Sequence, residues 1–369
     1  MNILANTNQL TKCLDIMEKA LPVRSTIPVI SNILFEIKGN EMIFSSTNLE
    51  MFIKAKMDYQ GEETGKILLP PKIIEVMRYF PTTDVNISIN WENYRIDISG
   101  GSAHFHLYGS DPEDYPISFA SQLNDSEGFF IEKGSFKKML KSVVFAASNE
   151  ETRPAFNGIF LLFNNDMISL TASDTYRLAI KEVKDEHWDF EERRSLVPAR
   201  SMRELLRILS DVGGEISIIN QENLISFKFD QIFFASRLLE EKYPDVSGVI
   251  PKEYKTRVVI DRKMLEEIIN RAALLAEGKN QAVNIIVKNQ YFEARVSAQE
   301  GSMEENIPVE QEGEDLDLFV NSRFILDVLK VIEDQKVVID FHGDGGPLIF
   351  RLIDDQSYLY LVLPIKKVN

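Results

Sequence analysis

The chain of 369 residues contains a single cysteine, Cys13, and no CxxC pair. One cysteine cannot form an internal disulfide, and the common zinc and redox motifs need at least two. This composition favours a reducing compartment, so we expect a cytoplasmic protein. Cys13 lies in an amphipathic stretch, and we interpret it as a small buried hydrophobic residue.

Long apolar runs are also missing. No run approaches the roughly 18 residues of a membrane-spanning helix. The start, MNILANTNQLTK, lacks the basic segment and apolar core of a secretory signal. We therefore expect no membrane partner. With 44% hydrophobic and 27% charged residues, the length predicts two or three globular domains of roughly 100–200 residues each.

Motifs of catalytic chemistry are scarce. There is no GxSxG and no HExxH, and GDGG at 343–346 lacks the Lys-Ser or Lys-Thr of a phosphate loop, which favours a hairpin turn. His104 and His106 could be metal ligands, but no third ligand is identifiable, and a solvent-facing strand is the simpler interpretation. The acidic pairs at 150–151 and 354–355 indicate no acid–base chemistry by themselves. We expect no catalytic residue, no metal and no cofactor.

Positive charge is in deficit. The 41 Lys and Arg against 57 Asp and Glu leave a net charge of -16. Binding of phosphates needs local positive charge, so this balance argues against nucleic acid if the basic residues are spread evenly. The acidic surplus is concentrated in segments such as EEKYPD, SMEEN and EQEGEDLD.

What the sequence does contain is a threefold repeat, the first thing to seek in a long chain. The motif LLPPKIIEVMRYF returns as LVPARSMRELLRIL and LFVNSRFILDVLKVI, and Pro198 follows Pro70 by 128 positions. STNLEMFIKA aligns with ASDTYRLAI in the same way. So long a period means that each copy is a domain with its own core. We predict domains at 1–125, 126–252 and 253–369.

Each copy begins with a helical pattern: TNQLTKCLDIMEKAL, GSFKKMLKSVVFAAS and DRKMLEEIINRAALLA. Asn8, Ser135 and Asp261 are the expected N-caps or near-caps. Strand patterns follow, then the repeated helix, then further strands. Two helices and about eight strands per copy predict an α+β fold with antiparallel sheets and the helices on one face.

The repeated helices carry basic residues, and Lys72, Arg200 and Arg323 fall at equivalent positions. If each domain presents both helices on one side, these charges gather on a common face and remove the objection to nucleic acid. The alternative is that they are ordinary solvated helix faces.

The motifs TIPVISN, STNLEM, FNGIF, TASDTYRLAI, LVPARSM, YPDVSGVIP and YLYLVLPIKK occur in one order along the chain. In order and spacing they resemble the bacterial DNA polymerase III beta subunit family over the whole length. The resemblance implies three domains of the DNA-clamp fold, with two copies closed head to tail into a ring that encircles double-stranded DNA. It also implies a processivity factor that slides on DNA and has no catalysis of its own.

The resemblance assigns DNA contacts to Arg24, Asn149, Arg153 and Arg200. It implies a homodimer contact that joins domain one to domain three of the other copy, with an acidic run near 300–305. The residues implied in this contact are Lys72, Val76, Phe105, Leu107, Leu274 and Leu275.

The resemblance further implies a hydrophobic peptide pocket between domains two and three. Its partners would be the DNA polymerase III alpha subunit, the clamp loader delta subunit, and other polymerases and repair proteins with clamp-binding motifs. The matching positions are Phe156, Ser173, Thr175, Tyr176, Arg177, Leu178, Pro244, Gly248, Val249, Gly345, Pro347, Leu361, Val362, Leu363, Pro364 and Ile365. Taken alone, LVLPI at 361–365 could also be an ordinary buried last strand.

The chain departs from the family pattern at Thr175 and Tyr176, where glycine and histidine are familiar, and at Asn280, where an aromatic residue is familiar. The tail from Lys366 to Asn369 has no assigned role. Two other functions stay open: an enzyme with a carboxylate metal site, and a protein-binding scaffold that is independent of DNA.

Overall fold

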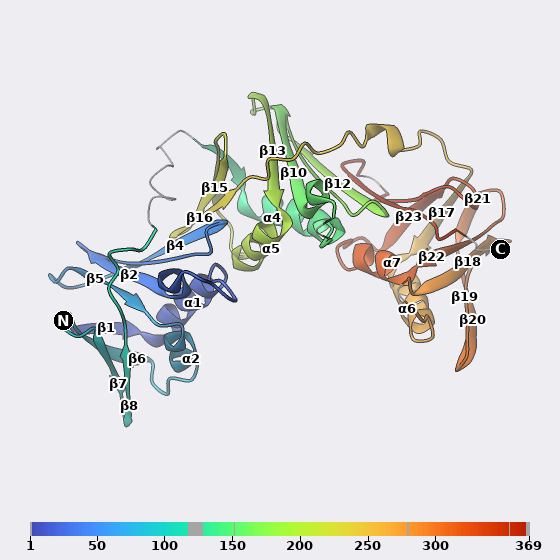
Figure 1. Cartoon of the computed structure of the whole chain (residues 1–369). Coiled ribbons are helices and arrows are strands. Elements are labelled where there is room, and N and C mark those ends of the chain that lie inside the picture. The colour runs from blue at the N-terminus through green and yellow to red at the C-terminus, as the bar shows by residue number, and fades with distance from the viewer. Residues whose placement is uncertain (1, 117–127, 151, 279, 354, 367–369) are drawn as a thin grey trace. The chain divides into compact units, whose positions relative to one another are not determined.

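The structure, a computed structural model, describes residues 2–116, 128–150, 152–278, 280–353 and 355–366. The predicted boundary at 125/126 and the acidic residues at 151 and 354 lie outside the described residues, as does the tail from Lys367. Every paired strand is antiparallel, as the sequence predicts. The three copies follow one order of elements (Figure 1).

The first copy has eight strands and two helices among its described residues. They are β1 (Asn2–Asn6), α1 (Thr7–Glu18), β2 (Ile33–Lys38), β3 (Glu41–Thr47), β4 (Met51–Asp58), β5 (Gly65–Leu69), α2 (Lys72–Arg78), β6 (Asp84–Asn90), β7 (Arg95–Gly100) and β8 (Ala103–Tyr108).

The second copy repeats this order. Its elements are β9 (Phe129–Glu132), α4 (Lys133–Val143), β10 (Gly158–Asn165), β11 (Met167–Ser173), β12 (Arg177–Lys184), β13 (Phe190–Pro198), α5 (Ala199–Ile208), β14 (Glu215–Asn220), β15 (Leu224–Phe229) and β16 (Ile232–Arg237).

The third copy adds one short strand, β21, to the same order. Its elements are β17 (Thr256–Asp261), α6 (Arg262–Ala273), β18 (Ala282–Lys288), β19 (Tyr291–Ala298), β20 (Gly301–Pro308), β21 (Glu310–Gly313), β22 (Leu316–Asn321), α7 (Ser322–Leu329), β23 (Lys336–Phe341), β24 (Leu348–Arg351) and β25 (Tyr358–Val362).

Two of the four sheets run from one copy into the next. The order β5-β2-β3-β4-β16-β15-β14-β9 joins the first copy to the second, and β13-β10-β11-β12-β25-β24-β23-β17-β21 joins the second to the third. The joining pairs are β4 with β16 and β12 with β25, both antiparallel. The other two sheets, β1-β6-β7-β8 and β20-β19-β18-β22, each belong to one copy.

The chain accordingly divides into two compact units that follow the sheets and not the repeats. Unit 1 comprises residues 1–136 and 203–238, and unit 2 comprises residues 137–202 and 239–369. Each unit contains one half of the middle copy, because continuous backbone pairing ties each half to a different neighbour. The predicted domain boundaries remain predictions.

Matched turns confirm the alignment of STNLEM with ASDTYR. In the first turn the Thr47 hydroxyl donates to the Met51 carbonyl at 2.7 Å and accepts from the Leu49 amide at 3.0 Å. In the second, the Ser173 hydroxyl donates to the Arg177 carbonyl at 2.7 Å and accepts from the Thr175 amide at 3.0 Å. The central residue has positive φ in both turns, 72° at Leu49 and 77° at Thr175.

The helices bury one face against their own sheets, with Leu10, Cys13 and Leu14 inward in α1 and Leu265 and Ile268 inward in α6. Cys13 is buried as predicted, and this burial raises the pKa of its thiol to about 12. Among the described residues, no helix is long and apolar enough to span a membrane.

Of the three expected caps or near-caps, one is the cap itself and the other two lie in the first turn of their helices. Asp261 does cap α6, since its side chain accepts from the Met264 amide at 3.0 Å. The cap of α1 is Asn6 and not Asn8, because β1 leads directly into the helix. Ser135 lies inside α4, where the Glu132 carboxylate accepts from the backbone amides of Gly134 and Ser135.

The position of the α1 cap can be tested by paired substitutions. Asn6→Ala should lower the free energy of unfolding by about 1 kcal/mol, since it leaves a helix amide without its acceptor. Asn8→Ala at the exposed neighbouring site should change it by less than about 0.5 kcal/mol. Urea denaturation of both variants measures the difference, and equal losses would contradict the assignment.

Candidate functional site

The last strand of the chain forms one wall of the predicted pocket. β25 pairs with β12, so that Arg177 lies opposite Val362 and Leu178 opposite Leu361. Beyond β25, the Leu363 amide donates to the Tyr176 carbonyl at 2.9 Å, and the Ile365 amide donates to the Phe319 carbonyl at 2.7 Å. Pro364 lies between these bonds and has no amide hydrogen to donate. The chain end thus passes from β12 to the edge of β22.

An apolar floor lies beneath this wall. Leu178, Ile349, Leu359 and Leu361 form a buried cluster, and Val246 and Ile250 of the segment after β16 pack against it. The same segment holds Pro244, Gly248 and Val249, all exposed. Phe156 reaches this segment through Tyr243, whose ring centroid lies 5.9 Å from that of Phe156. The turn with Gly345 and Pro347 adjoins Leu348, which pairs with Val362.

The structure therefore brings the predicted pocket residues together, and they differ in exposure, from buried through half-buried to exposed. Ser173, Leu178, Leu361 and Val362 are buried and can only form the floor. Three large apolar residues are exposed beside this floor: Tyr176 is 59% exposed, Val249 57% and Leu363 43%. The predicted function of these residues is a proposal that this geometry supports.

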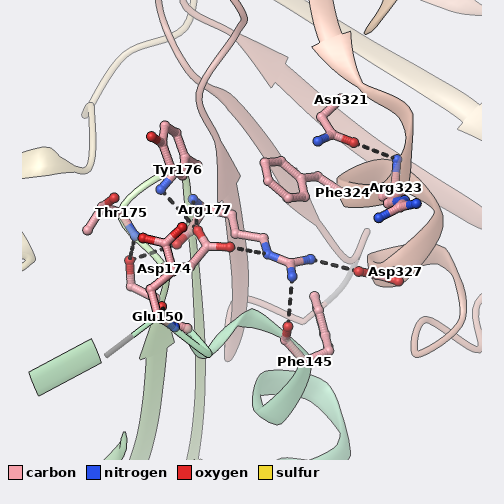
Figure 2. Close-up of polar contacts among 12 residues, drawn as sticks. Phe145, Glu150, Asp174, Thr175, Tyr176, Arg177, Asn321, Arg323, Phe324 and Asp327 are labelled. Carbon is pink, nitrogen blue, oxygen red and sulfur yellow. Dashed lines mark hydrogen bonds and ion pairs between the residues drawn. The ribbon is translucent and has the colours of Figure 1, made fainter. Parts of the chain in front are cut away.

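Arg177 is a nearly buried arginine that ties the turn at 173–177 to α7 (Figure 2). Its side chain is 11% exposed and donates to the carboxylates of Asp174 at 2.9 Å and Asp327 at 2.8 Å. It also donates to the Phe145 carbonyl at 2.9 Å. The guanidinium carbon lies 4.5 Å from the ring centroid of Phe324, a cation–π geometry.

The surroundings keep Arg177 charged. Burial by itself lowers the pKa of the guanidinium, but Tyr360 and the carboxylates of Asp327 and Asp174 outweigh this and raise the pKa overall. Tyr360 is fully buried, and its hydroxyl donates to the Phe324 carbonyl at 3.0 Å. Arg177 is therefore a structural link within unit 2 more than an exposed binding group.

Thr175 explains why glycine is familiar at its position. Its φ of 77° lies in the left-handed region, which costs a residue with a Cβ about 1 kcal/mol or more. The Thr175 hydroxyl accepts a hydrogen bond from Arg153 at 2.7 Å. Arg153, predicted to contact DNA, thus contacts the turn of the candidate pocket.

The sequence did not indicate Asp174, Phe145, Phe324 or Asp327 as parts of this site. Asp327 lies 150 positions from Arg177 in the chain, so no local spacing could have linked them. The only guide in the sequence was that these residues lie in the second and third copies of the repeat, the two copies between which the pocket was predicted.

Two of the six predicted dimer residues lie on the edge strand β8, two lie on α2, and two follow the end of α6. Phe105 and Leu107 belong to β8, and the Phe105 side chain is 42% exposed, with its ring 6.2 Å from that of Phe80. Lys72 pairs with Glu75 in α2, and Val76 is half-buried. Leu274 is 83% exposed at the end of α6, and Leu275 is half-buried. Arg271 of α6 binds Glu305 of β20 at 2.6 Å.

Acidic neighbours neutralise part of the basic charge on the helices. Arg78 binds Asp15 and Glu18 at 2.7 and 2.6 Å, and similar ion pairs hold Arg207 and Arg262. Other basic residues are exposed on α1, α4, α5 and α6 and make no ion pair with any described residue: Lys12, Lys138, Arg200 and Lys263. Arg24 and Asn149 are exposed on loops.

No group of three or more His, Cys, Asp and Glu side chains that could hold a metal occurs in the part of the chain that the structure describes. His104 and His106 are exposed on β8, which confirms the solvent-facing strand. GDGG lies in the turn between β23 and β24, as predicted.

Solved structures define the class of fold. The DNA polymerase sliding clamp of Bacillus subtilis matches with a TM-score of 0.90 and 28% identity, covering 100% of this chain and 99% of that one. The DNA polymerase III beta subunit of Thermotoga maritima matches with a TM-score of 0.89 and 26% identity, covering 99% of each chain. The fold is that of the three-domain sliding clamps.

Sequence comparisons identify the family. Residues 1–119, 130–245 and 247–366 match the models for the N-terminal, central and C-terminal domains of the DNA polymerase III beta subunit. The beta sliding clamp of Staphylococcus epidermidis is 31% identical over 360 residues, 94% of each chain, and that of Staphylococcus aureus is 30% identical over the same length. The chain belongs to the DNA polymerase III beta subunit family of sliding clamps. It is a non-catalytic processivity subunit of a DNA polymerase.

The link through Arg177 generates a stability prediction. Arg177→Ala should lower the free energy of unfolding of unit 2 by about 3 kcal/mol, because Asp174 and Asp327 lose their partner in a largely buried site. Arg323→Ala on the same face of α7 removes an exposed side chain and should cost less than about 0.5 kcal/mol. Urea denaturation monitored by amide exchange in α7 measures both, and a neutral Arg177→Ala would contradict the link.

Proposed function

We propose that two copies of the chain close head to tail into a ring around double-stranded DNA. The ring slides on the duplex and holds DNA polymerase III there through a hydrophobic peptide pocket. The observation that carries this proposal is the pair of sheet edges, β8 and β20.

The pattern of strand pairing supports ring closure. Each copy consists of two halves, in each of which a strand and a helix are followed by three strands. Within the chain, the last strand of the first half of one copy pairs with the last strand of the second half of the next copy, as β4 pairs with β16 and β12 with β25. β8 is the counterpart of β16 and β25, and β20 is the counterpart of β4 and β12. Each bonds to only one described strand, β8 to β7 and β20 to β19. A second copy supplies both missing edges at once, and such a head-to-tail contact makes a closed ring.

The exposed basic residues support loose contact with DNA. Lys12, Lys138, Arg200 and Lys263 are separate positive charges on helices of all three copies. Such contacts read phosphates and not bases, and each weakens with salt. We assign the same role to Arg24 and Asn149, and to Arg153 beside the pocket. Weak, sequence-independent contact suits a ring that must slide.

The apolar surface around Tyr176, Val249 and Leu363 supports peptide binding. Short peptides bind where a few apolar side chains enter a preformed groove that also offers polar groups. The occupants we propose are hydrophobic motifs of the DNA polymerase III alpha subunit, the clamp loader delta subunit, and other polymerases and repair proteins.

A scaffold that binds proteins without DNA is the second candidate, since the pocket by itself requires no ring. The two are separated by retention on circular DNA. Protein loaded on nicked circles with a clamp loader and ATP should stay on the circle during gel filtration and be lost once the circle is cut. Equal retention on circle and cut DNA would contradict encirclement. Loading a relative of known activity in parallel excludes an inactive loader.

The pocket is tested by two truncations. Deletion of 364–369 should abolish binding of an alpha-subunit peptide, because it removes Pro364 and the Ile365 bond to Phe319. Deletion of 366–369 leaves that bond in place and should preserve binding. Fluorescence anisotropy of a labelled peptide measures both. The dimer should survive both deletions, because the ring-closing edges are β8 and β20, and loss of the dimer would count against the pocket assignment.

A further inference from the structure

The two junctions within the chain fix the register that a third junction of the same kind would adopt. At the junction of β4 with β16, Lys54 lies opposite Phe233, and its ammonium nitrogen is 5.6 Å from the ring centroid. At the junction of β12 with β25, the equivalent pair is Ile180 opposite Leu359, within the apolar floor of the pocket. The same position in the register is thus occupied by a cation–π pair at one junction and by an apolar pair at the other.

Hairpin pairings locate the same position on the open edges. The closing pairs Phe229–Ile232 and Gly100–Ala103 align β16 with β8, so His104 is the counterpart of Phe233. The closing pairs Lys38–Glu41 and Lys288–Tyr291 align β3 with β19, so Ser45 corresponds to Arg295. Ser45 pairs with Lys54 and Arg295 with Glu304, so Glu304 is the counterpart of Lys54. If the open edges pair as the inner junctions do, His104 lies opposite Glu304.

The neighbouring positions are complementary in the same register. Phe105 is the counterpart of Phe234, and Met303 is the counterpart of Ile53. At the inner junction Phe234 lies opposite Ile53. The new junction therefore sets Phe105 against Met303 on the core side. His106 would lie opposite Ser302, with Glu304 as its diagonal neighbour. A slip of one residue would place the exposed histidines on the core side.

The charged groups around this pair are few and identifiable. On its own sheet His104 pairs with Ser99, and His106 pairs with Asp97, which Arg95 binds at 2.8 Å. On the other edge, Arg295 lies 3.3 Å from Glu304 and also binds Glu293. Glu305 is held by Arg271. Glu304 is therefore the acidic side chain on this face that is exposed and only loosely bound.

We propose that His104 of one copy pairs with Glu304 of the second copy across each ring-closing edge, so that closure of the ring is pH-dependent. This inference rests on the proposed ring. Histidine changes charge between about pH 5 and 8. Protonated His104 attracts Glu304, so the pair favours the dimer. Its contribution is full where His104 is protonated and Glu304 is still ionised, and it is lost as rising pH removes the imidazolium proton.

The expected effect is modest for one pair and larger for the ring. An exposed ion pair strengthens association by a factor of about two to five. A ring closed by two identical junctions contains the pair twice, which gives about four- to twenty-five-fold in the dissociation constant of the dimer. General loss of negative charge at low pH also favours association of so acidic a chain, so the test needs a matched histidine control.

Fluorescence-detected sedimentation of the full chain at pH 6.0 and 8.0, at constant ionic strength, tests the pair. His104→Gln and Glu304→Gln should each remove this part of the pH response, and the double variant should lose no more than either single variant. The control is His187→Gln, because His187 is exposed, contacts Asp185 at 2.8 Å and lies on neither edge. It should respond to pH like the unaltered chain.

A His104→Gln variant that keeps the full pH response overturns the His104–Glu304 pair while leaving the ring intact. A chain that dimerises equally at both pH values also overturns the His104–Glu304 pair and leaves the ring intact. A chain that stays monomeric at every concentration and pH overturns the proposed ring and this pair together.

Discussion

Every strand at the edge of a sheet carries backbone N–H and C=O groups that must be paired, covered or left to water. In this chain that constraint is met by joining sheets across the repeats, through β4 with β16 and β12 with β25. Because these pairings are continuous, the middle copy is divided between two compact units. Among the described strands, β8 and β20 remain edges of their sheets, and we propose that another copy completes them in the same way.

Joining strands across repeats also builds the surface of the proposed pocket. β25 reaches β12 only because the third copy adds its last strand to a sheet of the second, and that contact sets Leu361 against Leu178. Arg177 then binds Asp174 within its own turn and Asp327 on α7, which holds the two copies in one unit. The proposed binding surface thus follows from this junction, because it combines a buried apolar floor with the exposed side chains of Tyr176, Val249 and Leu363.

The sequence predicted the repeat, the antiparallel α+β class and the positions of the helices, because periodicity and matched motifs survive in all three copies. It did not locate the exact start of α1 or α4, since Asn8 and Ser135 are good capping residues that lie within the first turn of helices entered directly from strands. The pocket residues came from the family resemblance. Asp327 and Phe324 were missed because their contacts with Arg177 form only in the folded unit. The ion pairs of Arg78 with Asp15 and Glu18 could not be predicted either, because they form between two helices of the folded chain.

The proposed ring requires β8 and β20 to be buried against a second copy. Amide hydrogen exchange of Ala103–Tyr108 and Gly301–Pro308 above and below the dimer dissociation constant measures this directly, with β16 and β25 as internal standards. We predict that amides of both edges become protected together when the dimer forms, as those of β16 and β25 are at every concentration. Edges that exchange equally fast in monomer and dimer would contradict the ring.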